Sequence, residues 1–121
     1  ANVTTSITLT DAAGNASAAT TTVALSGESI DANTPTISST SVANGTYNVG
    51  DTVAVTITAG GDEQGLTLAG TFNGQTLTDI TDNSDGTYTG TYTVVEGNSD
   101  IADGANVTTS ITLTDAAGNA S

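Results

Sequence analysis

Residues 105–121 read ANVTTSITLTDAAGNAS, and residues 1–17 repeat the same letters. Within this stretch Val107, Ile111 and Leu113 are separated by even numbers of residues, so an extended strand places all three on one face. The two copies start 104 residues apart, which is close to the size of one β-sandwich domain, roughly 100 residues. We therefore expect the chain to be one period of a tandem array, with near-copies of itself as neighbours.

Short stretches of alternating hydrophobic residues, separated by turn residues, continue through the rest of the chain. Val53, Val55 and Ile57 share one face of such a stretch, and Asn73-Gly74 is a signal for a two-residue hairpin turn. The alternation predicts β-strands over residues 20–26, 36–42, 51–59, 66–72, 76–80, 87–95 and 105–114. These seven strands, in a chain without helix signals, favour an all-β, immunoglobulin-like antiparallel β-sandwich with Greek-key topology.

The repeated segment also divides the chain. We interpret residues 1–30 as the last two strands of a preceding repeat, residues 31–35 as a linker, and residues 36–121 as a repeat that lacks its own final strand. Strand 20–26 would end at the pole far from the linker, on a sandwich about 35–40 Å tall. Residues 27–35 reach at most about 32 Å. We therefore expect the N-terminal hairpin to complete a neighbouring molecule by strand swapping or to lie apart.

The charge of the chain excludes several classes of function. It has 13 Asp and Glu residues and no Lys, Arg, His or Cys, which gives a formal charge of −13. Without cationic side chains, it cannot bind nucleic acid or an anionic membrane surface by the usual electrostatic route. Catalysis by His, Lys, Arg or Cys is equally impossible, and the imidazole and thiolate ligands that zinc and other soft metals need are missing. A glycosidase would need paired carboxylates in an apolar cleft, whereas the acidic residues of this chain fall in polar, Gly-rich loops. We therefore expect no enzyme activity, no nucleic-acid partner and no membrane insertion.

Antiparallel strand order gathers the acidic residues at the two poles of the predicted sandwich. In an end-to-end array the poles of neighbouring domains meet, so acid faces acid at each junction. Two carboxylates about 4 Å apart repel by roughly 4 kcal/mol at an effective dielectric constant of 20, which favours a bound cation between them. Every Asp and Glu is expected in a loop or at a strand end. The pole beside the linker receives Asp31, Asp62, Glu63, Asp82, Asp85 and Asp115, with Asp79 close by, and the opposite pole receives Asp51, Glu96, Asp100 and Asp103.

Calcium is the cation that these residues favour. Ca²⁺ accepts six to eight oxygen ligands from carboxylates, amides and backbone carbonyls in flexible geometry, whereas Mg²⁺ demands a tighter octahedron. An Asp in a loop can instead form an Asx turn, and this alternative stays open for Asp82, Asp85, Asp100 and Asp103. The candidate ligands are these four residues and, converging from distant segments, Asp31, Asp62, Glu63 and Asp115, with the amide of Asn119 in the same turn as Asp115.

Four segments carry a resemblance to a known family: Asp31-x-x-x-Pro35, residues 45–51 ahead of an alternating strand, residues 102–104, and Asp115-Ala-Ala-Gly-Asn119. They resemble the bacterial immunoglobulin-like extender repeats of giant secreted RTX adhesins, in particular those of ice-binding adhesins. The resemblance implies a spacer that is stiffened by several Ca²⁺ ions and projects a distal binding domain from the surface of a Gram-negative cell. It also implies an extracellular location and end-to-end contact with copies of the same repeat.

The resemblance adds residues to the candidate metal site. By matching motif, it implies Ca²⁺ contacts at Asp31, Asp115 and Asn119, and at the equivalent copies Asp11 and Asn15. Asp100 and Asp103 are not part of this pattern and are included on charge alone.

A second function, from a different class, is direct binding of ice or another ligand through a Thr-rich sheet face. Residues 20–22 and 89–93 present hydroxyl and methyl groups at strand spacing. Thr is also a common outward-facing strand former, and an ordinary sandwich is twisted, whereas a lattice match needs a flat face. The sequence therefore favours the spacer.

Overall fold

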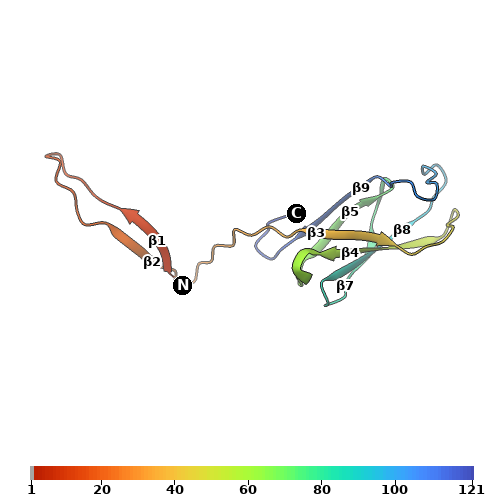
Figure 1. Cartoon of the computed structure of the whole chain (residues 1–121), viewed down its shortest axis with the longest axis horizontal. Helices are drawn as coiled ribbons and strands as arrows, with labels where there is room; N and C mark the ends of the chain where they lie inside the picture. The colour runs from red at the N-terminus through yellow and green to blue at the C-terminus, as the bar shows by residue number, and fades with distance from the viewer. Residues whose placement is uncertain (1) are drawn as a thin grey trace. The chain divides into compact units, whose positions relative to one another are not determined.

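The computed structural model describes residues 2–121, and these residues form antiparallel β-sheets. The chain makes two compact units, one ending at Asp31 and one running from Ala32 to Ser121 (Figure 1). No helix among residues 2–121 is both long enough and apolar enough to cross a membrane.

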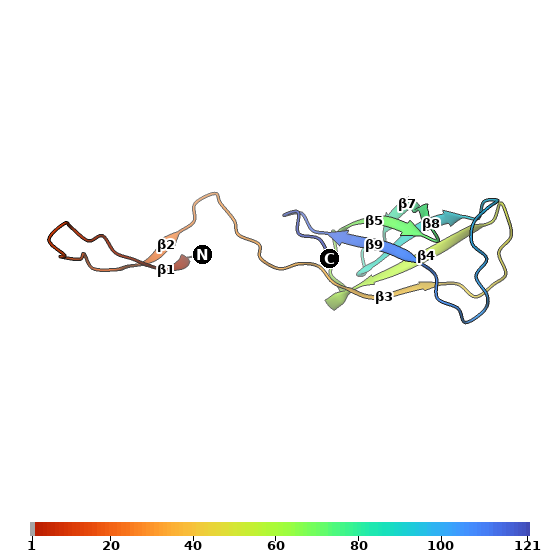
Figure 2. The same cartoon turned by 90° about the horizontal axis from the view of Figure 1, so that it is seen from above.

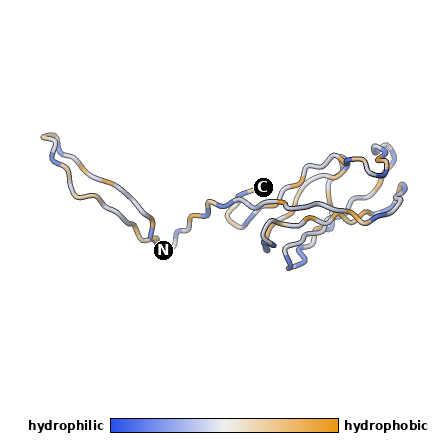
Figure 3. Tube along the Cα trace, viewed as in Figure 1, coloured by the Kyte–Doolittle hydropathy of each residue, from blue (hydrophilic) through white to orange (hydrophobic). Residues whose placement is uncertain are grey.

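The first unit is a two-stranded antiparallel hairpin. Strand β1 (Asn2–Ile7) pairs with β2 (Thr20–Ala24), with Val3 opposite Val23. Hydrophobic residues recur along the strands of both units (Figure 3). An isolated two-stranded hairpin cannot bury such residues by itself, and Ile7, Leu9 and Val23 are exposed.

The second unit contains two sheets (Figures 1 and 2). The first sheet has the strand order β3-β4-β8-β7, and the second has the order β6-β5-β9. The strands of the first sheet are β3 (Ile37–Val42), β4 (Thr52–Ala59), β7 (Thr78–Asp82) and β8 (Thr87–Thr93). Those of the second are β5 (Thr67–Phe72), β6 (Gln75–Thr76) and β9 (Thr109–Thr114).

The core lies between the inner faces of these two sheets, an arrangement consistent with a β-sandwich. The predicted face of β4 is confirmed, since Val53, Val55 and Ile57 are buried. The rings of Phe72 and Tyr92 pack across the two sheets with their centroids 5.4 Å apart. The other buried core residues are Ala59, Leu66, Leu68, Leu77, Tyr88 and Leu113, and Ile37, Val94, Val107 and Ile111 pack against them while partly buried.

The Asn73-Gly74 hairpin turn predicted from the sequence is present. Its two residues have φ angles of 49° and 77°, as a type I′ turn requires, and Phe72 pairs with Gln75 on either side of it.

The structure corrects three predictions about the strands. The predicted strand over residues 76–80 is divided between two sheets, because β6 pairs with β5, β7 pairs with β8, and the buried Leu77 marks the crossing. Asp79, expected in a loop or at a strand end, lies within β7. The strand predicted over 105–114 begins only at Thr109, because the preceding residues turn, with Ala105 N–H donating to the carbonyl of Ala102.

Candidate functional site

Two acidic loops of the second unit pack against each other at the pole where β4 ends. The first contains the short 3₁₀ turn η1 (Gly60–Asp62) and Glu63, and the second joins β7 to β8. A Cβ on Gly86 would lie 2.4 Å from the Asp62 Cα, so the loops meet only because residue 86 is glycine. The Tyr88 hydroxyl donates to the Glu63 carbonyl at 2.9 Å and accepts from Leu66 N–H at 3.1 Å.

Asp82 and Asp85 both bind backbone groups in these loops. Asp82 Oδ2 accepts from Gly65 N–H at 3.2 Å, and its Oδ1 accepts from Ser84 N–H at 2.8 Å. Asp85 Oδ1 accepts from the Thr87 hydroxyl at 2.6 Å and from Thr87 N–H at 2.9 Å. The hydroxyl bond, followed by the backbone bond, holds the pKa of Asp85 below its ordinary value. Both carboxylates therefore stabilise turns, as the Asx alternative predicts.

The Asp115–Asn119 turn closes on itself. Asp115 Oδ1 accepts from Asn119 N–H and Oδ2 accepts from the Asn119 side-chain amide, both at 2.9 Å. The side-chain amide of Asn119 is the main cause that lowers the pKa of Asp115. In the first unit, Asp11 and Asn15 make the same two bonds at 2.9 Å, and the pKa of Asp11 is lowered for the same reason.

Asp100 and Asp103 lie at the opposite pole, in the loop between β8 and β9. Together with Glu96 they line a hollow between this loop and the loop that joins β3 to β4. The Asn98 side chain organises the loop, because its Oδ1 accepts from the Tyr92 hydroxyl at 2.7 Å and from a backbone N–H. This role of Asn98 is not predicted from the sequence, because an Asn in a loop carries little signal for it.

The structure brings only part of the predicted site together. The loop holding Asp62 and Glu63 adjoins the loop holding Asp82 and Asp85, whereas Asp31 is the last residue of the first unit. Among residues 2–121, no three acidic side chains lie close enough to one another to form a candidate metal-binding group. None of the described carboxylates is buried.

Asp79 is the acidic residue whose position sequence reasoning missed. A register irregularity between Thr78 and Thr81 places it within β7 at a φ of 48°. Its Oδ2 accepts from the Thr91 hydroxyl at 3.0 Å. Strand alternation alone carries no signal for such an irregularity.

Comparisons with known proteins gave no match: no family model, no curated protein and no solved structure matched the chain.

Proposed function

We propose that the chain is a Ca²⁺-stabilised spacer, or extender, domain of a tandem-repeat bacterial surface adhesin, which projects a distal ligand-binding domain from the cell. The observation that carries this proposal is the repeat itself. Residues 1–17 and 105–121 are identical, 104 residues apart, and both copies form the same Asp-Asn turn. A repeat length that matches one folded unit is typical of a domain array.

Within this proposal the domain is an immunoglobulin-like Greek-key sandwich. The chain path supports this, because β3 and β4 lie in one sheet, β5 and β6 in the other, β7 and β8 in the first again, and β9 in the second. A final strand beside β9 would complete the pattern of that fold.

Calcium is the proposed stabilising ion because the 13 acidic residues have no side-chain counter-charge. Folding concentrates these charges, and their mutual repulsion destabilises the compact state. The carboxylates of Asp82, Asp85 and Asp115 accept hydrogen bonds from their own turns. An ionised carboxylate has about four lone-pair sites, so these groups retain capacity for a cation. A bound ion at a hundredfold excess over its Kd stabilises the folded state by about 2.7 kcal/mol.

Thermal unfolding in EDTA and in millimolar CaCl₂ tests this proposal. We expect a higher unfolding midpoint in CaCl₂ than in NaCl of the same ionic strength. Screening weakens the charge repulsion equally in both salts, so a difference between the two midpoints reports bound Ca²⁺. Equal midpoints in the two salts would contradict the calcium role. Titration calorimetry then gives the number of ions per chain, and MgCl₂ serves as the control for ion selectivity.

Direct ligand binding, including ice binding, is the second candidate. The register of β4 and β8 supports it, since Thr56 lies opposite Thr89 and Thr58 opposite Thr87, which makes ranks of Thr across the sheet. Against it, the Thr91 hydroxyl bonds to the Thr78 hydroxyl at 3.0 Å, so it is engaged within the sheet and not with an ice lattice. Thermal hysteresis measured on the chain alone would support this candidate, and its absence favours the spacer.

A further inference from the structure

Strand β9 lies at the edge of its sheet, since the strand order is β6-β5-β9. On the inner side of the strand, the Thr108 carbonyl accepts from Asn73 N–H at 2.9 Å. On the outer side, the Leu113 carbonyl accepts from Ser121 N–H at 2.9 Å, and Leu113 N–H donates to the Ser121 hydroxyl at 2.9 Å. Within residues 2–121, no strand continues along this outer edge. An unpaired edge is a template for another strand.

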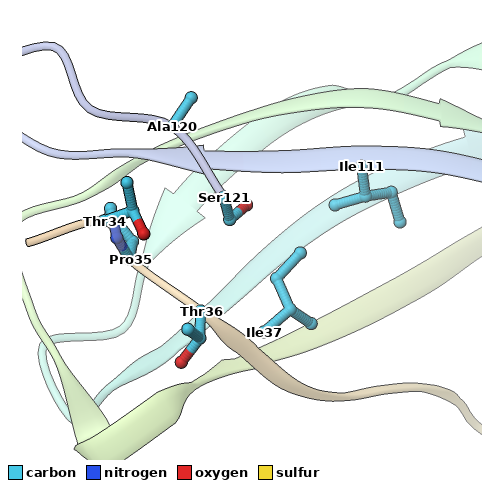
Figure 4. Close-up of a pocket in the computed structure, with 7 residues that line it drawn as sticks. All are labelled: Thr34, Pro35, Thr36, Ile37, Ile111, Ala120 and Ser121. Atoms are coloured by element: carbon cyan, nitrogen blue, oxygen red, sulfur yellow. The ribbon is translucent and has the colours of Figure 1, made fainter.

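An apolar groove lies beside this edge. It has a volume of about 380 Å³ and lies between Ile111 of β9 and Ile37 of β3, with Pro35 and Ser121 near one end (Figure 4). Pro35 is fully buried, whereas Ile37 and Ile111 are only partly buried although both pack against the core. The groove therefore leaves apolar surface that a further strand would cover.

The first unit contains a strand that pairs with a copy of this edge. Strand β1 has the sequence of the corresponding part of residues 105–121, and β2 is its partner. The same edge is involved, because the Leu9 carbonyl accepts from Ser17 N–H at 2.8 Å and Leu9 N–H donates to the Ser17 hydroxyl at 3.0 Å. These are the bonds that Leu113 makes with Ser121 in the second copy.

The pairing of β1 with β2 also predicts a register on β9. Val3 lies opposite Val23, and the residue after Val3 lies opposite Thr22. The repeat transfers these pairs to Val107 and Thr108, so β2 on β9 would place Val23 beside Val107 and Thr22 beside Thr108.

We propose that the outer edge of β9 and the groove beside it bind strand β2 of a second copy of this chain. In this exchange β2 leaves β1 and pairs with β9 in the register that it has on β1. The strand pairing is conserved, and the gain is apolar burial, because Val23 is 45% exposed in the hairpin and Ile37 and Ile111 are incompletely covered. The donor and acceptor surfaces differ, so the contact is heterologous and builds open chains or rings.

Chain length favours a second copy over the same chain. In this register β2 ends beside Asn106, about 27 Å along β9 from the end where Pro35 and Ser121 line the groove. Residues 25–35 reach at most about 40 Å when fully extended. A chain that used its own β2 would have to run this segment back along the strand over about two thirds of that reach, whereas a second copy has no such constraint. The inference does not depend on calcium or on the spacer role.

Cysteine cross-linking tests the partner and the register together, because the chain has no Cys. One chain carries Thr22→Cys and a ¹⁵N-labelled chain carries Thr108→Cys, and the mixture is oxidised. The proposed register makes these two positions a non-hydrogen-bonded pair, in which Cα atoms lie about 4.5 Å apart, within the range of a disulfide. We expect a labelled–unlabelled dimer, identified by its mass.

Thr20→Cys mixed with Thr108→Cys is the matched control, because it lies two residues out of register on the same face. A yield from the Thr22 pair no higher than that from the Thr20 pair would overturn the proposed register. If a chain with both Thr22→Cys and Thr108→Cys forms only an internal disulfide, and the mixed chains form none, the second-copy partner is wrong.

A solution measurement provides an independent readout. We expect the mass of the unmodified chain, measured by sedimentation, to rise with concentration. Val23→Asp places a charge on the face that would be buried and should raise the concentration needed for association by at least about tenfold. Thr22→Asp adds the same charge to the opposite face and should have little effect. Circular dichroism checks that the sheets are intact. A constant monomer mass, or equal effects of the two variants, would overturn the proposal.

Discussion

Two identical segments of this chain have different surroundings. Leu9 is 79% exposed in the first copy, whereas its equivalent Leu113 is 0% exposed in the second. Ile7 is 57% exposed, whereas its equivalent Ile111 packs against the core. In contrast, the turn that follows has the same hydrogen bonds in both copies. The turn is therefore set by its own five residues, while burial of the alternating face is set by a neighbouring sheet.

The neighbouring sheet supplies the difference through β5, which pairs with β9 and places Leu68 opposite Leu113. Close backbone approach makes this pairing possible, because a Cβ on Gly70 would lie 2.1 Å from the Ser110 carbonyl oxygen. Complete burial of a Leu side chain stabilises a fold by about 1.5–3 kcal/mol. The second copy gains this energy and the first copy, as a hairpin, does not.

The largest expected effect comes from making the same truncation in each copy. Leu113→Ala should lower the free energy of unfolding by about 2–5 kcal/mol, because it leaves a cavity in the core. Leu9→Ala should change it by less than about 0.5 kcal/mol, as is usual for exposed positions. Urea unfolding followed by circular dichroism measures both. Equal losses would mean that the first copy is also buried in solution.

Much of the fold can be predicted from the sequence because the core strands alternate regularly. Val53, Val55 and Ile57 lie on one buried face, and Asn73-Gly74 forms the expected hairpin. Identical segments, however, give identical predictions, so local pattern cannot say which copy enters the core. The crossing between the two sheets at Leu77 was not predicted either, because the alternation of hydrophobic residues continues through it.

The candidate site was predictable only at the level of loops. Strand order placed the loop of Asp62 beside the loop of Asp82, as the structure has them. The sequence carries no signal for how each carboxylate hydrogen-bonds, and Asp85 bonds within its own turn. That choice depends on backbone angles such as the positive φ of Ser84, which alternation does not encode.

The second expected effect concerns calcium. Under the proposed function, Asp115→Asn should remove a large part of the calcium-induced rise in the unfolding midpoint. Asp115 follows Thr114, which pairs with Thr67 at the end of the unit that holds the loops of Asp62 and Asp82. Asp11→Asn should leave the rise nearly unchanged, since the hairpin lacks that set of loops. Melting scans in EDTA and in CaCl₂ measure both. Equal effects would mean that the five-residue turn binds calcium by itself.

A smaller effect is expected at the glycines of the two turns. Gly14 and Gly118 have φ angles of 92° and 95°, and a Cβ on either would meet no other atom within 4 Å. Substitution by Ala therefore costs only the backbone penalty, about 1–2 kcal/mol. Gly118→Ala should lower the stability of the second unit by this amount, whereas Gly14→Ala should affect only the hairpin. Hydrogen exchange resolves the two regions, and a loss of protection in β9 caused by Gly14→Ala would contradict the prediction.

The smallest expected effect is on the two turn carboxylates, where the copies should behave alike. The side-chain amides of Asn15 and Asn119 lower the pKa of Asp11 and Asp115 from the ordinary value of 3.8. A lowered pKa contributes stability above the unfolded value, and this contribution is lost as the pH falls through the folded value. Asn15→Ala should raise the pKa of Asp11 alone, and Asn119→Ala that of Asp115 alone. An NMR titration of both carboxylates measures this. A pKa that is lowered at only one of the two Asp residues would show that the turn depends on its surroundings after all.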